Sequence, residues 1–165
     1  MNARATFSDA YSTGIQYFGR GRNDSEPDRY TPHCDGECTG DKHKSGTRMA
    51  TIVTYCHVAE TGGHTNFREC CWMSCILFFF CLLLPLHSSG NSGVHVKPEL
   101  HNAIFFSYID PETKVMDTGF SEHSGCPVFE GVKKIVVQWF RMGVSDEEPW
   151  TAFNTLGIKY ADQDQ

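Results

Sequence analysis

Short runs of alternating apolar and polar residues dominate the chain. Arg48–His57 alternates and is rich in β-branched residues, which predicts a strand ending at the turn signal Glu60–Gly63. Further strands are predicted at Gly14–Phe18, Val94–Lys97, Ala103–Tyr108 and Lys134–Phe140. Only Glu147–Leu156 has room for a helical turn or two. Short strands between turns, without a long amphipathic helix, predict a mostly β fold of the sandwich or jelly-roll type.

One apolar stretch does not fit this pattern. Cys70–Leu86 carries no charged residue over 17 positions, close to the ~20 apolar residues that span a bilayer. A second interpretation is an insertion over residues 69–90, such as a translated intron, because Phe, Leu, Pro and Ser have pyrimidine-rich codons. Its removal would join Arg68 to Asn91 in a strand–loop–strand connection, and sequencing the transcript tests it. A very apolar core strand is the third interpretation.

Size and charge narrow the classes of function. The 165 residues fit a single domain with one core. A formal net charge of −6 argues against a general nucleic-acid binder, which would show a basic face. Acidic residues gather in the last part of the chain, which predicts a solvated tail over residues 143–165. No apolar core of a secretory signal is visible in Met1–Phe18.

Eight cysteines are compatible with several arrangements. His33, Cys34, Cys38 and His43 include the ligand types of a zinc site, but the second pair of a structural site is missing. A disulfide between Cys34 and Cys38, or free thiols at both positions, would fit the sequence better.

Two histidines and a carboxylate provide the candidate chemistry. His33 and Asp35 lie in Tyr30-Thr-Pro-His-Cys-Asp35, and His123 lies in Glu122-His-Ser-Gly-Cys-Pro-Val128. Residues two apart on a strand share a face, so His33 and Asp35 are expected on one side. Two histidines and one carboxylate on one face of a metal form the facial triad of non-haem Fe(II) oxygenases. Lys133, ten positions past His123, can hold a distant carboxylate of a cosubstrate. A metal site divided between His33 and His123 also excludes a membrane span between them.

An ordered set of motifs extends this interpretation. The sequence contains Arg48-Met-Ala-Thr-Ile-Val-Thr-Tyr55, Gly62-Gly-His-Thr-Asn-Phe67, Val96-Lys-Pro98, Asn102-Ala-Ile-Phe-Phe-Ser-Tyr108 and His123-Ser-Gly-Cys-Pro-Val128. With the triad and Lys133, these segments resemble the prolyl 4-hydroxylase catalytic domain, in the Fe(II)/2-oxoglutarate dioxygenase superfamily. The resemblance runs from about Gly14 to Phe140.

The resemblance implies a double-stranded β-helix, a jelly roll, shortened at its N-terminal side. It implies three regions: an N-terminal segment at 1–13, a dioxygenase domain at 14–142 interrupted by the insertion 69–90, and the acidic tail at 143–165.

It also implies site residues and cofactors. His33, Asp35 and His123 would bind Fe(II), Lys133, Thr65 and Tyr17 would contact 2-oxoglutarate, and Tyr30 and Arg48 would contact the substrate peptide. L-ascorbate would keep the iron reduced, and the endoplasmic reticulum would be the compartment.

The implied activity is that of a procollagen-proline 4-dioxygenase. It would hydroxylate peptidyl proline at C4 in collagen-like or other proline-rich segments, converting 2-oxoglutarate and O2 to succinate and CO2. Two different functions are also compatible with the sequence: a catalytically inactive splice-type variant that binds proline-rich peptide, and a protein tethered to a membrane through residues 70–86.

Overall fold

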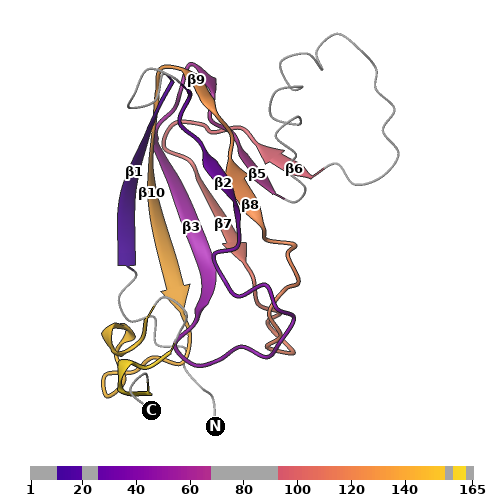
Figure 1. Cartoon of the computed structure of the whole chain (residues 1–165), viewed down its shortest axis with the longest axis vertical. Helices are drawn as coiled ribbons and strands as arrows, with labels where there is room; N and C mark the ends of the chain where they lie inside the picture. The colour runs from indigo at the N-terminus through magenta and orange to yellow at the C-terminus, as the bar shows by residue number, and fades with distance from the viewer. Residues whose placement is uncertain (1–10, 20–25, 68–92, 155–157, 163–165) are drawn as a thin grey trace.

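The computed structural model describes residues 11–19, 26–67, 93–154 and 158–162 (Figure 1). These described residues contain ten strands and two 3-10 turns, in chain order β1 Tyr11–Phe18, β2 Tyr30–His33, β3 Arg48–His57, β4 Thr61–Gly62, β5 Thr65–Phe67, β6 Val94–Val96, β7 Ala103–Ser107, β8 His123–Gly125, β9 Val128–Glu130, β10 Val132–Arg141, η1 Trp150–Ala152 and η2 Tyr160–Asp162. The mostly β prediction is confirmed.

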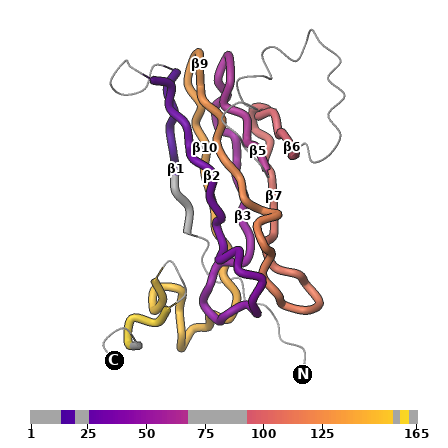
Figure 2. The backbone as a smooth tube through the Cα atoms, turned by 45° about the vertical axis from the view of Figure 1, so that its right-hand side comes forward, coloured from indigo at the N-terminus to yellow at the C-terminus, as the bar shows by residue number. Residues whose placement is uncertain are grey.

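Two four-stranded antiparallel sheets make up most of the described fold. The larger sheet has the order β1-β10-β3-β7, and the smaller has the order β2-β8-β5-β6. β4 and β9 pair separately as a two-stranded ribbon. Figures 1 and 2 show the long strands of the larger sheet running side by side, with the shorter strands of the smaller sheet across them. Neighbours far apart in sequence, such as β1 and β10, are typical of a jelly roll.

Period-2 alternation in β10 determines which side chains enter the core. Lys133, Ile135 and Val137 are buried, whereas Lys134 between them is exposed. β3 alternates in the same way, burying Thr51, Val53 and Tyr55. Ile135 and Val137 pack with Val53 and Tyr55 in one apolar cluster. The inner face of the larger sheet therefore carries an apolar core with one lysine in it.

Several predicted bounds shift in the structure. The first strand begins at Tyr11, three residues before the predicted Gly14, and the last is extended to Val132–Arg141. Val94–Val96 and Ala103–Ser107 are each one residue shorter than predicted. The helical turn expected within Glu147–Leu156 is the 3-10 turn η1.

The apolar block at 69–90 lies outside the described residues, so its three interpretations all stay predictions. Its described flanks, β5 and β6, pair with each other, and Phe67 stands opposite Val94. Within the described part of the chain, no helix has the length and apolar character needed to cross a membrane.

Candidate metal centre

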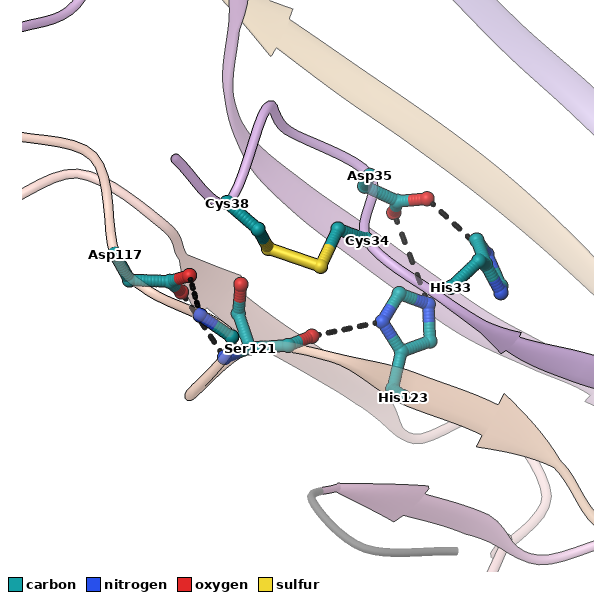
Figure 3. The surroundings of a disulfide bond; sticks show 8 residues. His33, Cys34, Asp35, Cys38, Asp117, Ser121 and His123 are labelled. Atoms are coloured by element: carbon teal, nitrogen blue, oxygen red, sulfur yellow. Dashed lines mark hydrogen bonds and ion pairs between the residues drawn. A yellow bond between two sulfur atoms is a disulfide. The ribbon is translucent and has the colours of Figure 1, made fainter. Parts of the chain in front are cut away.

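His33 and His123 face each other across two paired strands. They are register partners in the β2–β8 ladder, and their ring centroids lie 4.4 Å apart. His33 Nδ1 lies 2.9 Å from the Thr31 carbonyl oxygen. His123 Nδ1 lies 3.0 Å from the Ser121 carbonyl oxygen (Figure 3). Because a carbonyl oxygen only accepts, each Nδ1 carries the hydrogen in a neutral ring. Each Nε2 then keeps its lone pair for a metal or a proton.

Asp35 completes the triad from a loop rather than from the strand. β2 ends at His33, so the expectation that both residues share a strand face is wrong. The Asp35 carboxylate is nonetheless buried, with Oδ1 3.4 Å from His33 Nε2 and Oδ2 3.9 Å from His123 Nε2. Thr51 Oγ1 on β3 donates a 2.6 Å hydrogen bond to Oδ2. Sequence reasoning missed Thr51 because its partner lies 16 positions away.

The three side chains fit the donor set of an iron site. Their ligand atoms all lie within 4.8 Å of one another, and no other cluster of three such residues occurs in the described part of the chain. The contacts of Asp35 with both imidazoles are longer than normal hydrogen bonds. Two imidazole nitrogens and one carboxylate oxygen suit Fe(II) and leave coordination positions open.

Burial and neighbouring polar groups shift the pKa values of the triad residues in opposite directions. Burial would raise the pKa of Asp35, but its contact with His33, the hydrogen bond from Thr51 and the nearby His123 lower it to about 2. Burial would lower the pKa of His33, but its contacts with Asp35 and the Thr31 carbonyl raise it. For His123, burial dominates and lowers the pKa despite Asp35. Asp35 therefore stays ionised, and His123 favours the neutral form that can bind a metal.

The cysteines beside the triad are cross-linked. Cys34 and Cys38 form a disulfide, one of the arrangements compatible with the sequence. The zinc interpretation is wrong for this state, because zinc binds thiolates and not a disulfide. His43, the fourth residue of the candidate zinc set, has its Nε2 atom 3.2 Å from the Thr47 carbonyl oxygen.

A pocket of about 370 Å3 between the two sheets contains the triad and Lys133 together. Lys133 is 2% exposed, and its Nζ lies 5.5 Å from the centre of the Tyr17 ring and 5.7 Å from that of Tyr55. No carboxylate among the described residues pairs with it. Burial lowers the pKa of Lys133 to about 8. A buried cation without a counter-ion is a site for an anionic ligand.

Thr65 and Tyr17 also line this pocket. Thr65 is 5% exposed, and its Oγ1 lies 2.8 Å from the hydroxyl of Tyr55, a contact that the sequence did not indicate. Tyr17 is buried on β1, where its register partner is Lys133. Burial raises the pKa of Tyr17 to about 12, so its hydroxyl is a neutral hydrogen-bonding group. The structure thus places Lys133, Thr65 and Tyr17, the three residues predicted to contact the cosubstrate, in one wall of the pocket.

Tyr30 and Arg48 lie at the same pocket. Tyr30 is 47% exposed and packs edge-on against the His33 ring at 4.4 Å. The Arg48 guanidinium lies 4.1 Å from the centre of the Trp139 ring. Trp139 also lines the pocket, and it is partly buried against the apolar cluster of the larger sheet.

The model of one family, described as the 2OG-Fe(II) oxygenase superfamily, matches residues 20–141. The chain belongs to this superfamily. The match includes all three triad residues and Lys133.

Two curated relatives of this chain come from Arabidopsis thaliana. The chain is 31% identical over 123 residues to "Probable prolyl 4-hydroxylase 3", covering 70% of this chain and 39% of that protein. It is 28% identical over 122 residues to "Prolyl 4-hydroxylase 5", covering 69% of this chain and 38% of that protein. The chain thus spans well under half of these relatives.

A solved structure supports the fold. The viral collagen prolyl hydroxylase vCPH from Paramecium Bursaria Chlorella virus-1, in its 2OG complex, aligns with a TM-score of 0.54 at 23% identity. The alignment covers 82% of this chain and 62% of the viral chain. This likeness confirms the jelly roll predicted from the sequence.

Proposed function

We propose that this oxygenase uses Fe(II), 2-oxoglutarate and O2 to hydroxylate peptidyl proline at C4, forming succinate and CO2. The observation that carries the proposal is one pocket that holds both the His33–Asp35–His123 donor set and the buried cation Lys133. The similarity to plant prolyl 4-hydroxylases supports proline as the target.

The metal would be held by His33 Nε2, one Asp35 oxygen and His123 Nε2. The carbonyls of Thr31 and Ser121 hold the two rings in the tautomer that directs Nε2 toward Asp35. Bound iron would activate O2, the oxidant, with two electrons drawn from 2-oxoglutarate and two from the C–H bond that becomes C–OH. The protein contributes orientation of these groups and a shielded pocket.

The wall of the pocket would hold the cosubstrate. Lys133 would pair with the distal carboxylate of 2-oxoglutarate, and the hydroxyls of Thr65 and Tyr17 would donate hydrogen bonds to it. A charge-assisted contact on a buried lysine is stronger than the same contact in water. The fixed position of Lys133 relative to the triad would also orient the keto-acid end toward the metal.

The more open side of the site would receive the peptide. Tyr30 presents an exposed aromatic ring beside His33. Arg48, held over Trp139, offers a cation that can donate to peptide carbonyl groups. Flat aromatic surfaces suit the rigid, apolar ring of proline, as in other proline-rich recognition. Collagen-like and other proline-rich segments are the substrates we propose.

The proposal also includes a reductant for the iron and a cellular compartment. L-ascorbate would return oxidised iron to the ferrous state. The endoplasmic reticulum would be the compartment, and the Cys34–Cys38 disulfide supports an oxidising environment.

Mass spectrometry of a proline-rich peptide tests the activity. With Fe(II), 2-oxoglutarate and ascorbate, the full chain should add one oxygen atom per modified proline and release an equal amount of succinate. Asp35→Ala should lower the rate by more than about 100-fold, since losing even an outer-shell partner costs up to about 100-fold. Asp146→Asn, an exposed acidic position in the C-terminal region, is the matched control. Succinate release without peptide oxidation would refute proline as the substrate.

A further inference from the structure

The disulfide beside the triad encloses one of its members. Cys34 directly precedes Asp35, and Cys38 follows it by three positions, so the bond closes a five-residue loop around the carboxylate. Figure 3 shows the cross-link beside Asp35, with His33 and His123 on the other side of the carboxylate. The position of Asp35 therefore depends on the shape of this loop.

Little else holds the main chain of the loop. Outside the strand ladders, no backbone hydrogen bond in the described part of the chain involves residues 34–39. Glu37 pairs with Lys44 at 3.6 Å, but this lysine is exposed and such pairs contribute little. Gly36 packs closely on the Tyr108 side chain, because an added Cβ would come within 2.3 Å of it. The cross-link is thus the principal covalent constraint on the segment.

The loop also has a conformation that a free chain would disfavour. Cys38 has φ +47°, in the left-handed region that non-glycine residues seldom adopt. Without the bond, the chain around Cys38 gains access to more favourable conformations. Asp35 would keep only its side-chain hydrogen bond from Thr51 and its contacts with the histidines.

The two cross-linked residues are open to solvent in part. Cys34 and Cys38 are both partly exposed, and Cys34 lines the pocket that contains the triad. In thiol–disulfide exchange, one sulfur of a dithiol attacks the bond and its second sulfur completes the exchange. Two electrons and two protons pass to Cys34 and Cys38, and the dithiol becomes a disulfide. The metal donors themselves are not altered chemically.

We propose that Cys34–Cys38 is a thiol–disulfide exchange site that controls the affinity of the triad for a divalent metal. The oxidised loop holds Asp35 in place for binding, and reduction by a dithiol loosens the loop and weakens binding. This redox proposal depends on one part of the proposed function, namely that the triad binds a metal. By linkage, the metal must protect the disulfide from reduction by the same factor.

Mn(II) binding, followed by electron paramagnetic resonance, tests the proposal on the full chain without needing catalysis. We expect the oxidised protein to bind Mn(II) about tenfold or more tightly than protein treated with dithiothreitol and desalted anaerobically, the range seen when supports of metal ligands are lost. Cys34→Ser/Cys38→Ser should bind as weakly as the reduced protein, with or without the dithiol. Cys56→Ser, which removes an exposed free thiol, should behave as the wild type.

A second measurement needs no variant. Alkylation and peptide mapping report the fraction of Cys34–Cys38 that is reduced at each dithiol concentration. Saturating Mn(II) should raise the dithiol concentration needed for half reduction. Equal Mn(II) affinity in both redox states, or no protection by Mn(II), would overturn the redox proposal and leave the proposed function intact. Failure of the oxidised wild type to bind Mn(II) at all would overturn both.

Discussion

At the residue scale, Lys133 connects the proposed chemistry to pH. Burial lowers its pKa to about 8, and a bound dicarboxylate beside Nζ would raise it again. The bound state then holds the proton more tightly than the free state, so binding takes up a proton above about pH 8. We expect affinity for 2-oxoglutarate to fall above that pH, with a slope approaching about tenfold per pH unit.

Calorimetry at several pH values, in buffers with different ionisation enthalpies, measures both the affinity and the proton uptake. Lys133→Met should bind 2-oxoglutarate weakly, and its affinity should lose the pH dependence that arises above about pH 8. A wild-type affinity that stays unchanged from neutral pH to about 1.5 units above that pKa would show that Lys133 does not pair with the cosubstrate.

Thr51 is the second residue with a specific expected role. Its hydroxyl is fully buried and donates to Asp35 Oδ2, which fixes the rotation of the carboxylate. Thr51→Val keeps the shape but removes the donor, and we expect metal affinity to fall about 10- to 100-fold. Thr51→Ser should restore most of it. Thr54→Val, on the same strand with its side chain on the opposite face, is the control, and Mn(II) titration is the measurement.

At the scale of elements, the Gly62-Gly63 turn connects the β4–β9 ribbon to the site. Gly62 has φ +88°, and a Cβ there would lie 2.2 Å from the Pro127 carbonyl oxygen. The neighbouring Gly63 amide donates to that same oxygen at 2.9 Å. Gly62→Ala must therefore move the chain just after His123 or adopt another backbone conformation.

We expect Gly62→Ala to lower the free energy of unfolding by at least about 1–2 kcal/mol, the cost of a left-handed alanine. Gly14→Ala, in an open position of β1 with nothing within 4 Å, should change it by less than about 0.5 kcal/mol. Urea denaturation compares the two. Similar stability for both variants would contradict the role given to this turn.

The long strands could be predicted from the sequence, whereas of the strands with three residues or fewer only Val94–Val96 was predicted. β3 and β10 have ten residues each, enough for the alternation to indicate a strand, while Lys133 was indicated by its spacing from His123. β5, β8 and β9 have three residues each, too few for a period-2 signal. These strands form through pairing with partners far along the chain.

The candidate site, too, could be predicted only in part from the sequence. Motif resemblance indicated the triad, Lys133 and Thr65, but the hydrogen bond from Thr51 to Asp35 depends on how β3 packs on the loop after β2. The disulfide was one of several possible arrangements, because spacing alone does not determine cysteine pairing. Tertiary packing decided both.

At the scale of the whole molecule, the proposed ligands would connect the two sheets. His33 and His123 belong to the smaller sheet, and Lys133 belongs to the larger. A metal and 2-oxoglutarate bound together would therefore stabilise the folded chain against separation of its layers. At ligand concentrations near 100 times the dissociation constant, a single ligand contributes ~2.7 kcal/mol.

For a chain of this size, we expect Mn(II) with 2-oxoglutarate to raise the unfolding temperature by roughly 5–10 °C, at about 2–4 °C per kcal/mol. His123→Ala should abolish most of the shift, and His101→Ala, outside the pocket, should retain it. Differential scanning calorimetry measures it. A shift of equal size in the His123 variant would place the metal elsewhere.

The claim that one pocket holds both metal and cosubstrate has a direct test. Titration of 2-oxoglutarate into the full chain by anaerobic calorimetry, with and without Fe(II), measures how far 2-oxoglutarate binding depends on the metal. The account predicts one cosubstrate per chain, tight only when Fe(II) is present, and lost in His123→Ala. Binding of 2-oxoglutarate that is indifferent to both Fe(II) and the His123 substitution would contradict it.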